Sequence, residues 1–510
     1  MTHYDIIIIG TGAGGGTLAY ALAPTKKRIL VIERGDFLPR EKENWDVKAV
    51  FLENRYKTKE VWHDAVGKEI HPGTHYYVGG NTKVYGAALL RLREKDFEEI
   101  QHAGGVSPKW PVPYSDFQPY YLLAEKLYHV HGQRGVDPFE PAEKEPFPYK
   151  ALRHEPRVQQ LFDGIKGLGL KPFPLPLGLL LDEENREKSQ CIRCDTCDGF
   201  PCLVDAKSDS EISCIKPALE YPNVTLLTKT KAIRLETDST GKKVTRLEVE
   251  RDGKKEFYSA DIHIVSCGAI NSAALLLQSK NDQHPEGLAN SSGMLGRNYM
   301  CHNNSAMIAI STTSHHTSFQ KTFGINDFYF EAPDWKYPLG HIQLLGTVKK
   351  DMLRGEAPFF TPDIALDTMA HHIVGWWLTS EDLPDPNNRV TLDSDGKVVL
   401  QYRPNNEEGH HRLVKKLKEI LHSLSHSFIP TSIHLSKQMP VDAVAHQVGT
   451  CRFGTDPKTS VLDTDCKAHD LENLYVVDGS FFPSSGASNP ALTIIANALR
   501  VADILKKQIK

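Results

Sequence analysis

The sequence predicts an α/β fold with an α+β part, in which a mainly parallel sheet is joined by an antiparallel one. A β-branched run, Tyr4–Ile9, leads directly into the glycine-rich segment Gly10–Gly15 and then into an apolar, helix-like stretch. A second strand-to-helix junction lies at 262–272. Between about 303 and 443 the pattern changes to short alternating strands, among them 306–310, 341–348 and 373–378. Strands that alternate with helices indicate a parallel sheet, whereas successive alternating strands indicate an antiparallel one.

The first strand, its glycine-rich loop and the following helix carry a ligand-binding pattern. Gly10 permits the tight turn, Gly12 lets backbone approach a pyrophosphate, and Gly15 lets the helix, expected at about Thr17–Leu22, pack closely on the strand. The helix N-terminus would then face the phosphates. The next strand ends at Glu33, about twenty residues after the glycines, where an acid can bind a ribose. We expect a bound dinucleotide rather than an unliganded turn, and these residues leave FAD and NAD open.

Length, composition and charge are typical of a globular protein that acts on a small molecule. The 510 residues include 60 Lys and Arg and 64 Asp and Glu, which gives a net charge of −4. No run of like charge indicates a nucleic-acid partner, and no stretch approaches the roughly twenty apolar residues of a membrane span. Because the first strand begins at once, without room for a signal peptide, we expect a cytoplasmic protein whose nine cysteines are thiols or ligands.

Three further segments resemble one family of flavoproteins. Glu33-Arg34-Gly35 follows the glycine loop, Val78–Gly86 is a second glycine-rich segment, and Trp110–Tyr121 reads Trp-Pro-x-x-Tyr-x-Asp-x-x-Pro-Tyr-Tyr. In this order they resemble the glucose-methanol-choline (GMC) oxidoreductases, and within that family the pyranose oxidase and sugar dehydrogenase-like members. The resemblance favours FAD over NAD. It implies a Rossmann-like FAD-binding domain with a discontinuous, antiparallel-sheet substrate domain.

The resemblance also implies a division of the chain and a set of cofactor residues. Residues 1–100, 190–302 and 444–510 would form the FAD-binding domain, and 101–189 and 303–443 the substrate-binding domain with its covering loops. Within this second part, the proline-rich stretch 130–188 is interpreted as a long covering loop or lid. The residues expected to bind FAD are Gly10, Gly12, Gly15, Glu33, Arg34, Gly79, Gly80, Asn81, Thr82, Ala232, Asp478, Gly479, Pro490, Ala491 and Thr493. Where some relatives carry a flavin-linking histidine this chain has Val84, so FAD is expected to be noncovalent, with His75 as the alternative attachment point.

The candidate catalytic residues lie near the C-terminus. His446 begins a His-x-x-Gly-Thr element, and Asn489 occupies the position that is His or Asn in the resembling family. An isolated histidine is more often an ordinary one, but this context favours a catalytic role. Hydride leaves a carbinol carbon easily only if its hydroxyl proton is removed, and a neutral imidazole can take that proton. An amide donor such as Asn489 can hold the developing alkoxide without competing for the proton.

These observations predict FAD-dependent oxidation of a CH-OH group to a carbonyl, with a sugar or glycoside hydroxyl favoured over a choline-like, aromatic or long-chain alcohol. Oxygen and other electron acceptors remain open. The alternatives are oxidation of a non-sugar alcohol, a flavin-bound lyase or photoenzyme, and an electron-transfer subunit; an NAD-linked dehydrogenase is a further rival.

Cysteines and histidines elsewhere provide weaker signals. Cys191, Cys194, Cys197 and Cys202 have spacing suited to an iron-sulfur cluster, but reduced structural thiols are favoured and no metal ligand is assigned. His422 and His426 stand four apart on a helix and are expected to be solvated. In His371-His372 and Trp376-Trp377, one residue of each pair can face a cavity, where an aromatic face suits the C-H side of a sugar.

Overall fold

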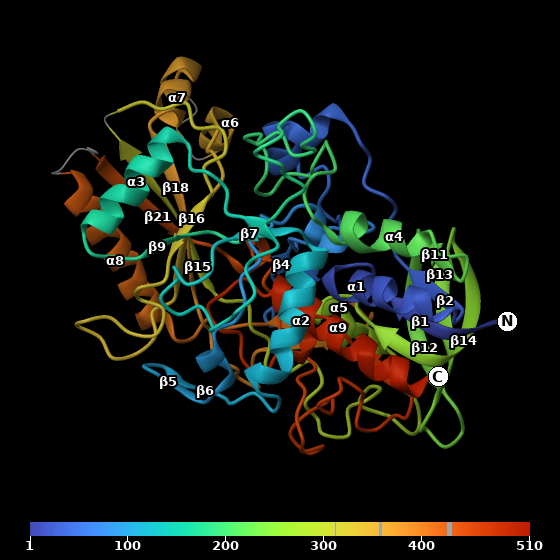
Figure 1. The fold of residues 1–510 in the computed structure, drawn as a ribbon. Coiled ribbons are helices and arrows are strands. Elements are labelled where there is room, and N and C mark those ends of the chain that lie inside the picture. Colours follow the sequence, from blue (N-terminus) through green and yellow to red (C-terminus); the bar gives the residue numbers. More distant parts are fainter. Residues whose placement is uncertain (312, 356, 358–359, 426–430, 510) are drawn as a thin grey trace.

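The computed structural model describes residues 1–311, 313–355, 357, 360–425 and 431–509, and two sheets organise them (Figure 1). The first sheet has a parallel part and an antiparallel part that share one long strand, β14. The parallel part contains, in spatial order, β11 (Val224–Leu227), β2 (Ile29–Ile32), β1 (Thr2–Ile9), β14 (Lys254–Val265) and β22 (Leu474–Val476). The antiparallel part consists of β12 (Thr230–Thr237), β13 (Val244–Arg251) and the first half of β14.

The parallel part forms from short, almost purely aliphatic strands. In β1 the four isoleucines at 6–9 are buried, and all of β2 is buried as well, as expected for strands covered on both faces. The helices α1 (Ala13–Leu22) and α2 (Tyr114–Leu127) both pack against α9 (Ala491–Gln508) beside this sheet (Figure 1). Helix α1 begins four residues earlier than the sequence predicts, because Gly12 already takes the N-cap position.

The second sheet is antiparallel throughout, as predicted. Its strand order is β21 (Thr431–Gln438), β15 (Asn303–Ser311), β18 (Ile373–Ser380), β17 (His341–Leu344), β16 (Phe323–Ile325) and β9 (Pro172–Pro174). Helices α8 (Glu407–Ser425) and α3 (Pro156–Gly167) lie beside it (Figure 1). The apolar stripe of α8, which includes Leu413, Leu417 and Leu421, is buried in one core cluster with Val158 of α3 and Trp376 of β18.

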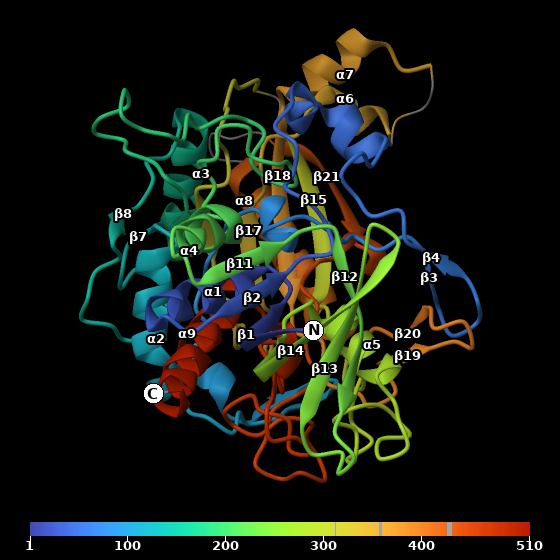
Figure 2. The ribbon, with the colours of Figure 1, turned by 90° about the vertical axis from the view of Figure 1, so that its right-hand side faces the viewer.

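Smaller sheets and helices complete the fold. Strands β19 (Arg389–Leu392), β20 (Val398–Gln401), β3 (Trp62–His63) and β4 (Glu69–Ile70) form a small sheet at one edge of the molecule (Figure 2). Besides short 3₁₀ and π turns, the other elements of the described residues are β5 (Ile100–His102), β6 (Gly105–Ser107), β7 (Val130–Gly132), β8 (Tyr149–Lys150), β10 (Leu177–Gly178), α4 (Lys216–Leu219), α5 (Ala269–Gln278), α6 (Lys350–Arg354) and α7 (Asp363–Ala370).

The interpretation of 130–188 as a long covering loop or lid was wrong. This stretch contains β7, β8, β10 and α3, and β9 adds a strand to the antiparallel sheet. Several of its prolines lie at element boundaries, such as Pro156 at the start of α3, where a missing N–H is tolerated. The segment 101–189 contributes α2 to the first sheet's surroundings and β9 to the second sheet, and the predicted domain division stays a prediction. Among the described residues, no helix is both long and apolar enough to cross a membrane.

Candidate active site

A cavity of about 1260 Å³ lies where the loops of the first sheet meet the antiparallel sheet. The loops that follow β1, β2 and β14 contribute to its lining, together with 442–447 and Trp377. In an open α/β sheet, ligands bind outside the carboxyl ends of parallel strands, and the cavity is in that position. The predicted cofactor residues that line it are Gly10, Gly12, Glu33, Arg34, Gly80, Asn81, Thr82, Ala232, Asp478, Gly479, Pro490 and Ala491.

The glycines of the first loop have two different roles. A Cβ added to Gly14 would lie 1.9 Å from the Val477 oxygen, and one added to Gly15 would lie 2.1 Å from the Gly10 oxygen. These glycines therefore allow α1 to pack closely on neighbouring backbone. At Gly12 a Cβ would meet no protein atom within 4 Å. Since Gly12 lines the cavity at the N-terminus of α1, the open space suits a phosphate-bearing ligand.

Glu33 links the two glycine-rich segments through Thr11. One carboxylate oxygen accepts hydrogen bonds from the Thr11 hydroxyl at 2.6 Å and the Thr11 amide at 3.2 Å. The Thr11 hydroxyl oxygen in turn accepts the Gly79 amide at 3.0 Å. Burial raises the pKa of Glu33, and the hydrogen bonds oppose this rise. Gly79 thus fixes the second glycine segment from outside the cavity lining.

Asp478 fixes the end of β22 to the start of α5. Its carboxylate accepts hydrogen bonds from the Gly268 amide at 3.0 Å and the Ser272 hydroxyl at 2.5 Å. Its other oxygen accepts the Ser480 amide at 2.8 Å. Burial raises the pKa of Asp478, although these donors favour its charged form. This arrangement places Asp478 on the cavity wall beside Gly479.

Thr493 is not placed for the direct contact with the cofactor that the sequence predicts. It is fully buried on α9, and its hydroxyl is 2.8 Å from the Tyr121 hydroxyl of α2. The side chain therefore joins two helices and is outside the cavity lining, unlike the preceding Asn489 and Ala491.

The charged stretch that follows Arg34 supplies much of the cavity wall. Lining residues from it are Val50, Phe51, Asn54, Lys57, Glu60, Val61, Trp62, His63 and Glu69. The Arg34 guanidinium lies 3.7 Å from the Tyr76 ring centroid and donates to Glu60 at 2.5 Å. No periodic pattern marks this stretch, because its residues approach the cavity individually along an irregular path.

His446 and Asn489 come together at the cavity wall. The Asn489 Nδ2 lies 3.5 Å from the His446 Nε2, and both residues line the cavity. Burial, together with repulsion from His302 and His341, lowers the pKa of His446 to about 3, so its imidazole is neutral at ordinary pH. A neutral ring nitrogen beside an amide donor is an arrangement that can remove a hydroxyl proton and hold the oxygen that remains.

His302 was missed in the sequence reasoning. Its Nδ1 lies 3.1 Å from the Nδ1 of His446, and the two rings are nearly perpendicular. It precedes β15 and belongs to no motif that was singled out, so only its later pairing with His446 reveals it.

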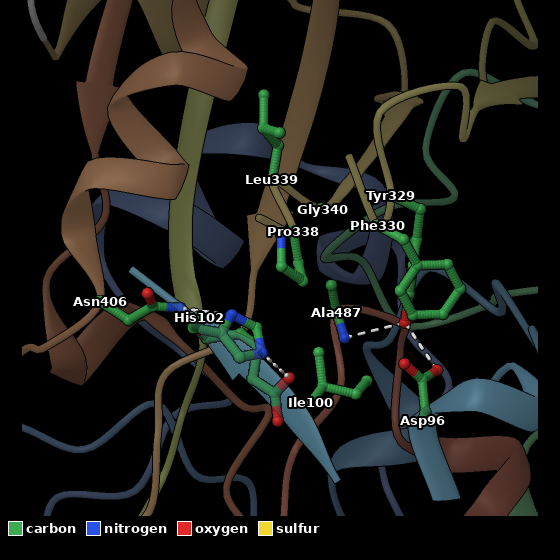
Figure 3. A pocket seen from close by; sticks show the side chains of 11 residues that line it. Asp96, Ile100, His102, Tyr329, Phe330, Pro338, Leu339, Gly340, Asn406 and Ala487 are labelled. Carbon is green, nitrogen blue, oxygen red and sulfur yellow. Dashed lines mark hydrogen bonds and ion pairs between the residues drawn. The ribbon is translucent and has the colours of Figure 1, made fainter. Parts of the chain in front are cut away.

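The loop that precedes Asn489 is held by side chains from distant parts of the chain. The Tyr329 hydroxyl accepts the Ala487 amide at 3.0 Å and donates to Asp96 at 2.9 Å (Figure 3). Glu381 accepts a hydrogen bond from the Gly486 amide at 3.1 Å. A cavity of about 10 Å³ beside them has room for about one water molecule. Burial raises the pKa of Asp96 to about 7, and the charge of Glu381 adds to this rise. The buried acids Asp96 and Glu381 therefore hold the loop that leads to Asn489.

Of the two aromatic pairs, Trp377 faces the cavity whereas Trp376 is fully buried in the second core. His371 and His372 follow α7 and are not cavity residues; their Nδ1 atoms lie 2.9 Å and 2.7 Å from the backbone oxygens of Asp367 and Ser311. His426 lies outside the described residues, and His422 is exposed.

The four clustered cysteines are free thiols. Cys191 is buried, and burial raises its pKa to about 12. Cys194, Cys197 and Cys202 are partly buried. Within the parts of the chain that the structure describes, no group of three or more His, Cys, Asp or Glu side chains is arranged to hold a metal ion. The iron-sulfur alternative therefore gains no support from this geometry.

Comparison with known proteins decides the family. Models of the N- and C-terminal GMC oxidoreductase regions match residues 73–304 and 384–498. The chain belongs to the GMC oxidoreductase family. Paromamine 6'-oxidase of Streptomyces fradiae is 31% identical, with 98% of this chain and 90% of that protein covered. The fructose dehydrogenase large subunit of Gluconobacter japonicus is 24% identical, with 99% and 98% covered.

A solved formate oxidase from Aspergillus oryzae, studied for modification of its FAD, has the same fold, with a TM-score of 0.70 at 15% identity over 99% of this chain and 98% of that one. The predicted family and fold are thus confirmed. This GMC member is an oxidoreductase of CH-OH groups, and the family indicates FAD as its cofactor. The open space at Gly12 and the size of the cavity fit a dinucleotide.

Proposed function

We propose that this enzyme oxidises a sugar or glycoside hydroxyl, with His446 as the base, Asn489 as the donor to the substrate oxygen, and noncovalent FAD. The observation that carries the proposal is the meeting of His446 and Asn489, 3.5 Å apart, in the cavity that also contains the glycine-rich loop. Proton removal and cofactor binding thereby share one cavity.

His446 and Asn489 have different roles at the substrate oxygen. The neutral imidazole of His446 accepts the hydroxyl proton, and the low pKa of the free ring means that the base is available throughout the neutral range. Asn489 donates to the oxygen as negative charge develops on it, and the buried acids behind its loop limit its movement. Both groups keep the carbinol carbon in one orientation.

The chain's own residues hold the cofactor. The α1 N-terminus and Gly12 suit its pyrophosphate, Glu33 suits a ribose, and Ala232 with its neighbours suits the adenine end. Bound FAD supplies the hydride acceptor. Val84 lines the cavity and cannot form a histidyl link, which supports noncovalent binding. His75 also lines the cavity, and its ring Nδ1 lies 3.3 Å from the Asn81 amide oxygen.

Trp377 and the relatives support a sugar or glycoside as the substrate. An indole face on the cavity wall can cover the C-H side of a pyranose ring. The names paromamine 6'-oxidase, 6'''-hydroxyparomomycin C oxidase and fructose dehydrogenase point in the same direction. A non-sugar alcohol is the second candidate, since 2-methyl-1,2-propanediol dehydrogenase and a long-chain-alcohol oxidase also match over 99% of this chain.

The test is anaerobic reduction of the purified flavoprotein by a panel of alcohols. We expect paromamine or fructose to bleach the flavin absorbance and 2-methyl-1,2-propanediol or a long-chain alcohol to leave it largely unchanged. Bleaching by the non-sugars alone would assign the second candidate. Absence of bleaching by any alcohol would instead favour a lyase, a photoenzyme or an electron-transfer subunit. Repeating the reaction of the alcohol that bleaches the flavin, with oxygen and with artificial acceptors, then identifies the class of electron acceptor.

Two simpler measurements test the noncovalent binding of FAD and the cytoplasmic location of the protein. Acid precipitation should release all the flavin into the supernatant, whereas flavin retained in the pellet would indicate a covalent link, with His75 as the first position to map. Fractionation of the source cells tests the proposed cytoplasmic location, because the enzyme should then appear with cytoplasmic markers.

A further inference from the structure

His302 is brought to His446 by a short backbone pairing between distant segments. Met300 and Val448 form an antiparallel bridge with amide-to-oxygen distances of 3.0 and 2.9 Å. His302 and His446 lie two residues from this bridge on their respective segments, in the same direction along the antiparallel pair, so the bridge brings the two residues close together. The bridge therefore sets the 3.1 Å contact between the two Nδ1 atoms.

The backbone at His302 is held in an unfavourable conformation. Its φ of +65° lies in the left-handed region, which non-glycine residues seldom occupy. Asp382 holds this turn by accepting the amides of Cys301 at 3.0 Å and His302 at 2.9 Å. The Tyr402 hydroxyl donates to the same carboxylate at 3.1 Å. Strain that is maintained by a buried carboxylate beside a reacting group points to a role for the strained residue.

The partners of His302 determine which of its nitrogens carries the proton. Its Nε2 lies 3.2 Å from the backbone oxygen of Ser485, and that oxygen can only accept a hydrogen bond. Nε2 of His302 therefore carries the hydrogen. Burial lowers the pKa of His302, so the ring is neutral and its Nδ1 has a lone pair. This lone pair can only accept the hydrogen bond from His446, whose Nδ1 must then be the donor.

The opposite side of His446 agrees with this assignment. If Nδ1 of the neutral His446 ring carries the hydrogen, its Nε2 carries the lone pair. That nitrogen faces the Nδ2 of Asn489, which is a donor. Both neighbours of His446 fit the same tautomer, in which the Nε2 lone pair lies beside Asn489 at the cavity wall.

We propose that His302 is a positioning residue that holds His446 in the Nδ1–H tautomer and so presents a basic Nε2 to the substrate hydroxyl. The proposal rests on the proposed role of His446 as base. When Nε2 takes the hydroxyl proton, the O–H bond breaks, its electron pair stays on the substrate oxygen, and the positive ring keeps donating its Nδ1–H to His302. An oriented partner of this kind is the general means by which a catalytic imidazole is kept in its active tautomer.

The tautomer can be measured in the wild-type holoenzyme. Proton-nitrogen correlation spectra of protein labelled with ¹⁵N-histidine, assigned by comparison with His446→Gln, should show His446 protonated at Nδ1 and unprotonated at Nε2. A His446 ring protonated at Nε2 would overturn the proposal without requiring any variant at His302.

Two variants of equal shape test the functional consequence. His302→Leu removes the acceptor and should lower kcat about 10- to 100-fold, because a buried donor on His446 loses its partner and the tautomer is no longer fixed. KM should change less than about threefold, since His302 does not line the cavity. His302→Asn places an oxygen near the former Nδ1, and asparagine tolerates a positive φ, so most of kcat should return. Flavin content and the thermal midpoint show that both variants are folded.

The outcomes separate this inference from the proposed function. If His446→Gln loses turnover while folded His302→Leu retains wild-type kcat, His446 is the base and the positioning role is wrong. If His446→Gln retains turnover, the proposed function itself fails. Equal losses in folded His302→Leu and His302→Asn would show that the acceptor atom is irrelevant, and this too would overturn the proposal.

Discussion

The cofactor side and the substrate side of the cavity are built in different ways. On the cofactor side, consecutive backbone positions such as Gly10–Gly14 form the wall, and their roles follow from local geometry. On the substrate side, His446, Asn489 and Trp377 come from different segments of the chain. His446 and the loop before Asn489 contact buried side chains behind them. If the proposed roles hold, cofactor binding depends on the space next to backbone, whereas catalysis depends on the tautomer and orientation of a few side chains.

Removing the base should produce the largest effect on the substrate side. We expect His446→Ala to lower kcat by about 10²- to 10⁴-fold, the usual contribution of a positioned general base. FAD content should remain at the wild-type level, because the glycine-rich loop is untouched. Stopped-flow flavin reduction and the flavin-to-protein absorbance ratio measure the two properties separately. Loss of FAD together with activity would break the division between the two sides.

Removing the donor should have the next largest effect. Asn489→Ala should lower kcat by about 10²- to 10³-fold, because the developing negative charge loses a pre-oriented donor. Asn489→His is the matched control, as it restores an N–H at this position and should recover part of the rate. Steady-state kinetics with the identified substrate measure kcat for both variants. Equal rates for the alanine and histidine variants would argue against a donor role.

Two alanine substitutions in the first loop separate folding from cofactor binding. Gly14→Ala places a methyl group 1.9 Å from the Val477 oxygen, so the free energy of unfolding should fall by about 1–3 kcal/mol or more. Gly12→Ala meets no protein atom within 4 Å, and stability without FAD should change by less than about 0.5 kcal/mol. Its methyl group enters the space of the pyrophosphate, so FAD affinity should fall at least about tenfold. Denaturant unfolding and flavin titration of the apoprotein measure these effects, and the reverse pattern would contradict the assigned roles.

His263 provides a contrast to the paired histidines of the substrate side. It is fully buried on β14, neither ring nitrogen has a hydrogen-bond partner, and burial lowers its pKa to about 3. His263→Leu should stabilise the protein by about 1–3 kcal/mol at neutral pH, because two unsatisfied polar atoms are removed.

The same variant should change the response of stability to acid. Between its ordinary value of about 6.5 and the folded value of about 3, the unfolded His263 binds a proton that the folded form does not. Wild-type stability from this group is therefore present above about pH 6.5 and is lost as the pH falls, by about 1.4 kcal/mol per pH unit. The advantage of His263→Leu should grow accordingly in urea unfolding at pH 7, 6 and 5. An advantage independent of pH would show that the pKa of His263 is not lowered in the folded protein.

The sequence by itself determined the features that depend on consecutive residues. The β1 isoleucines, the glycine-rich loop and Glu33 predict the nucleotide-binding unit, because a buried strand, a tight turn and a helix start each need particular residues at fixed spacing. The alternating pattern of 303–311 and 373–380 likewise predicts the antiparallel sheet. His446 and Asn489 became the candidate catalytic residues because they lie within recognisable motifs.

Only the tertiary structure decided which distant residues meet. The Met300–Val448 bridge joins segments almost 150 positions apart and brings His302 to His446, and no local pattern encodes that register. The hydroxyl of Thr493 pairs with Tyr121 because α2 packs on α9. The irregular stretch from Val50 to Glu69 reaches the cavity without any periodicity. Periodicity and turn chemistry act over a few residues, whereas hydrogen-bond partners and burial are fixed only when separate elements pack together.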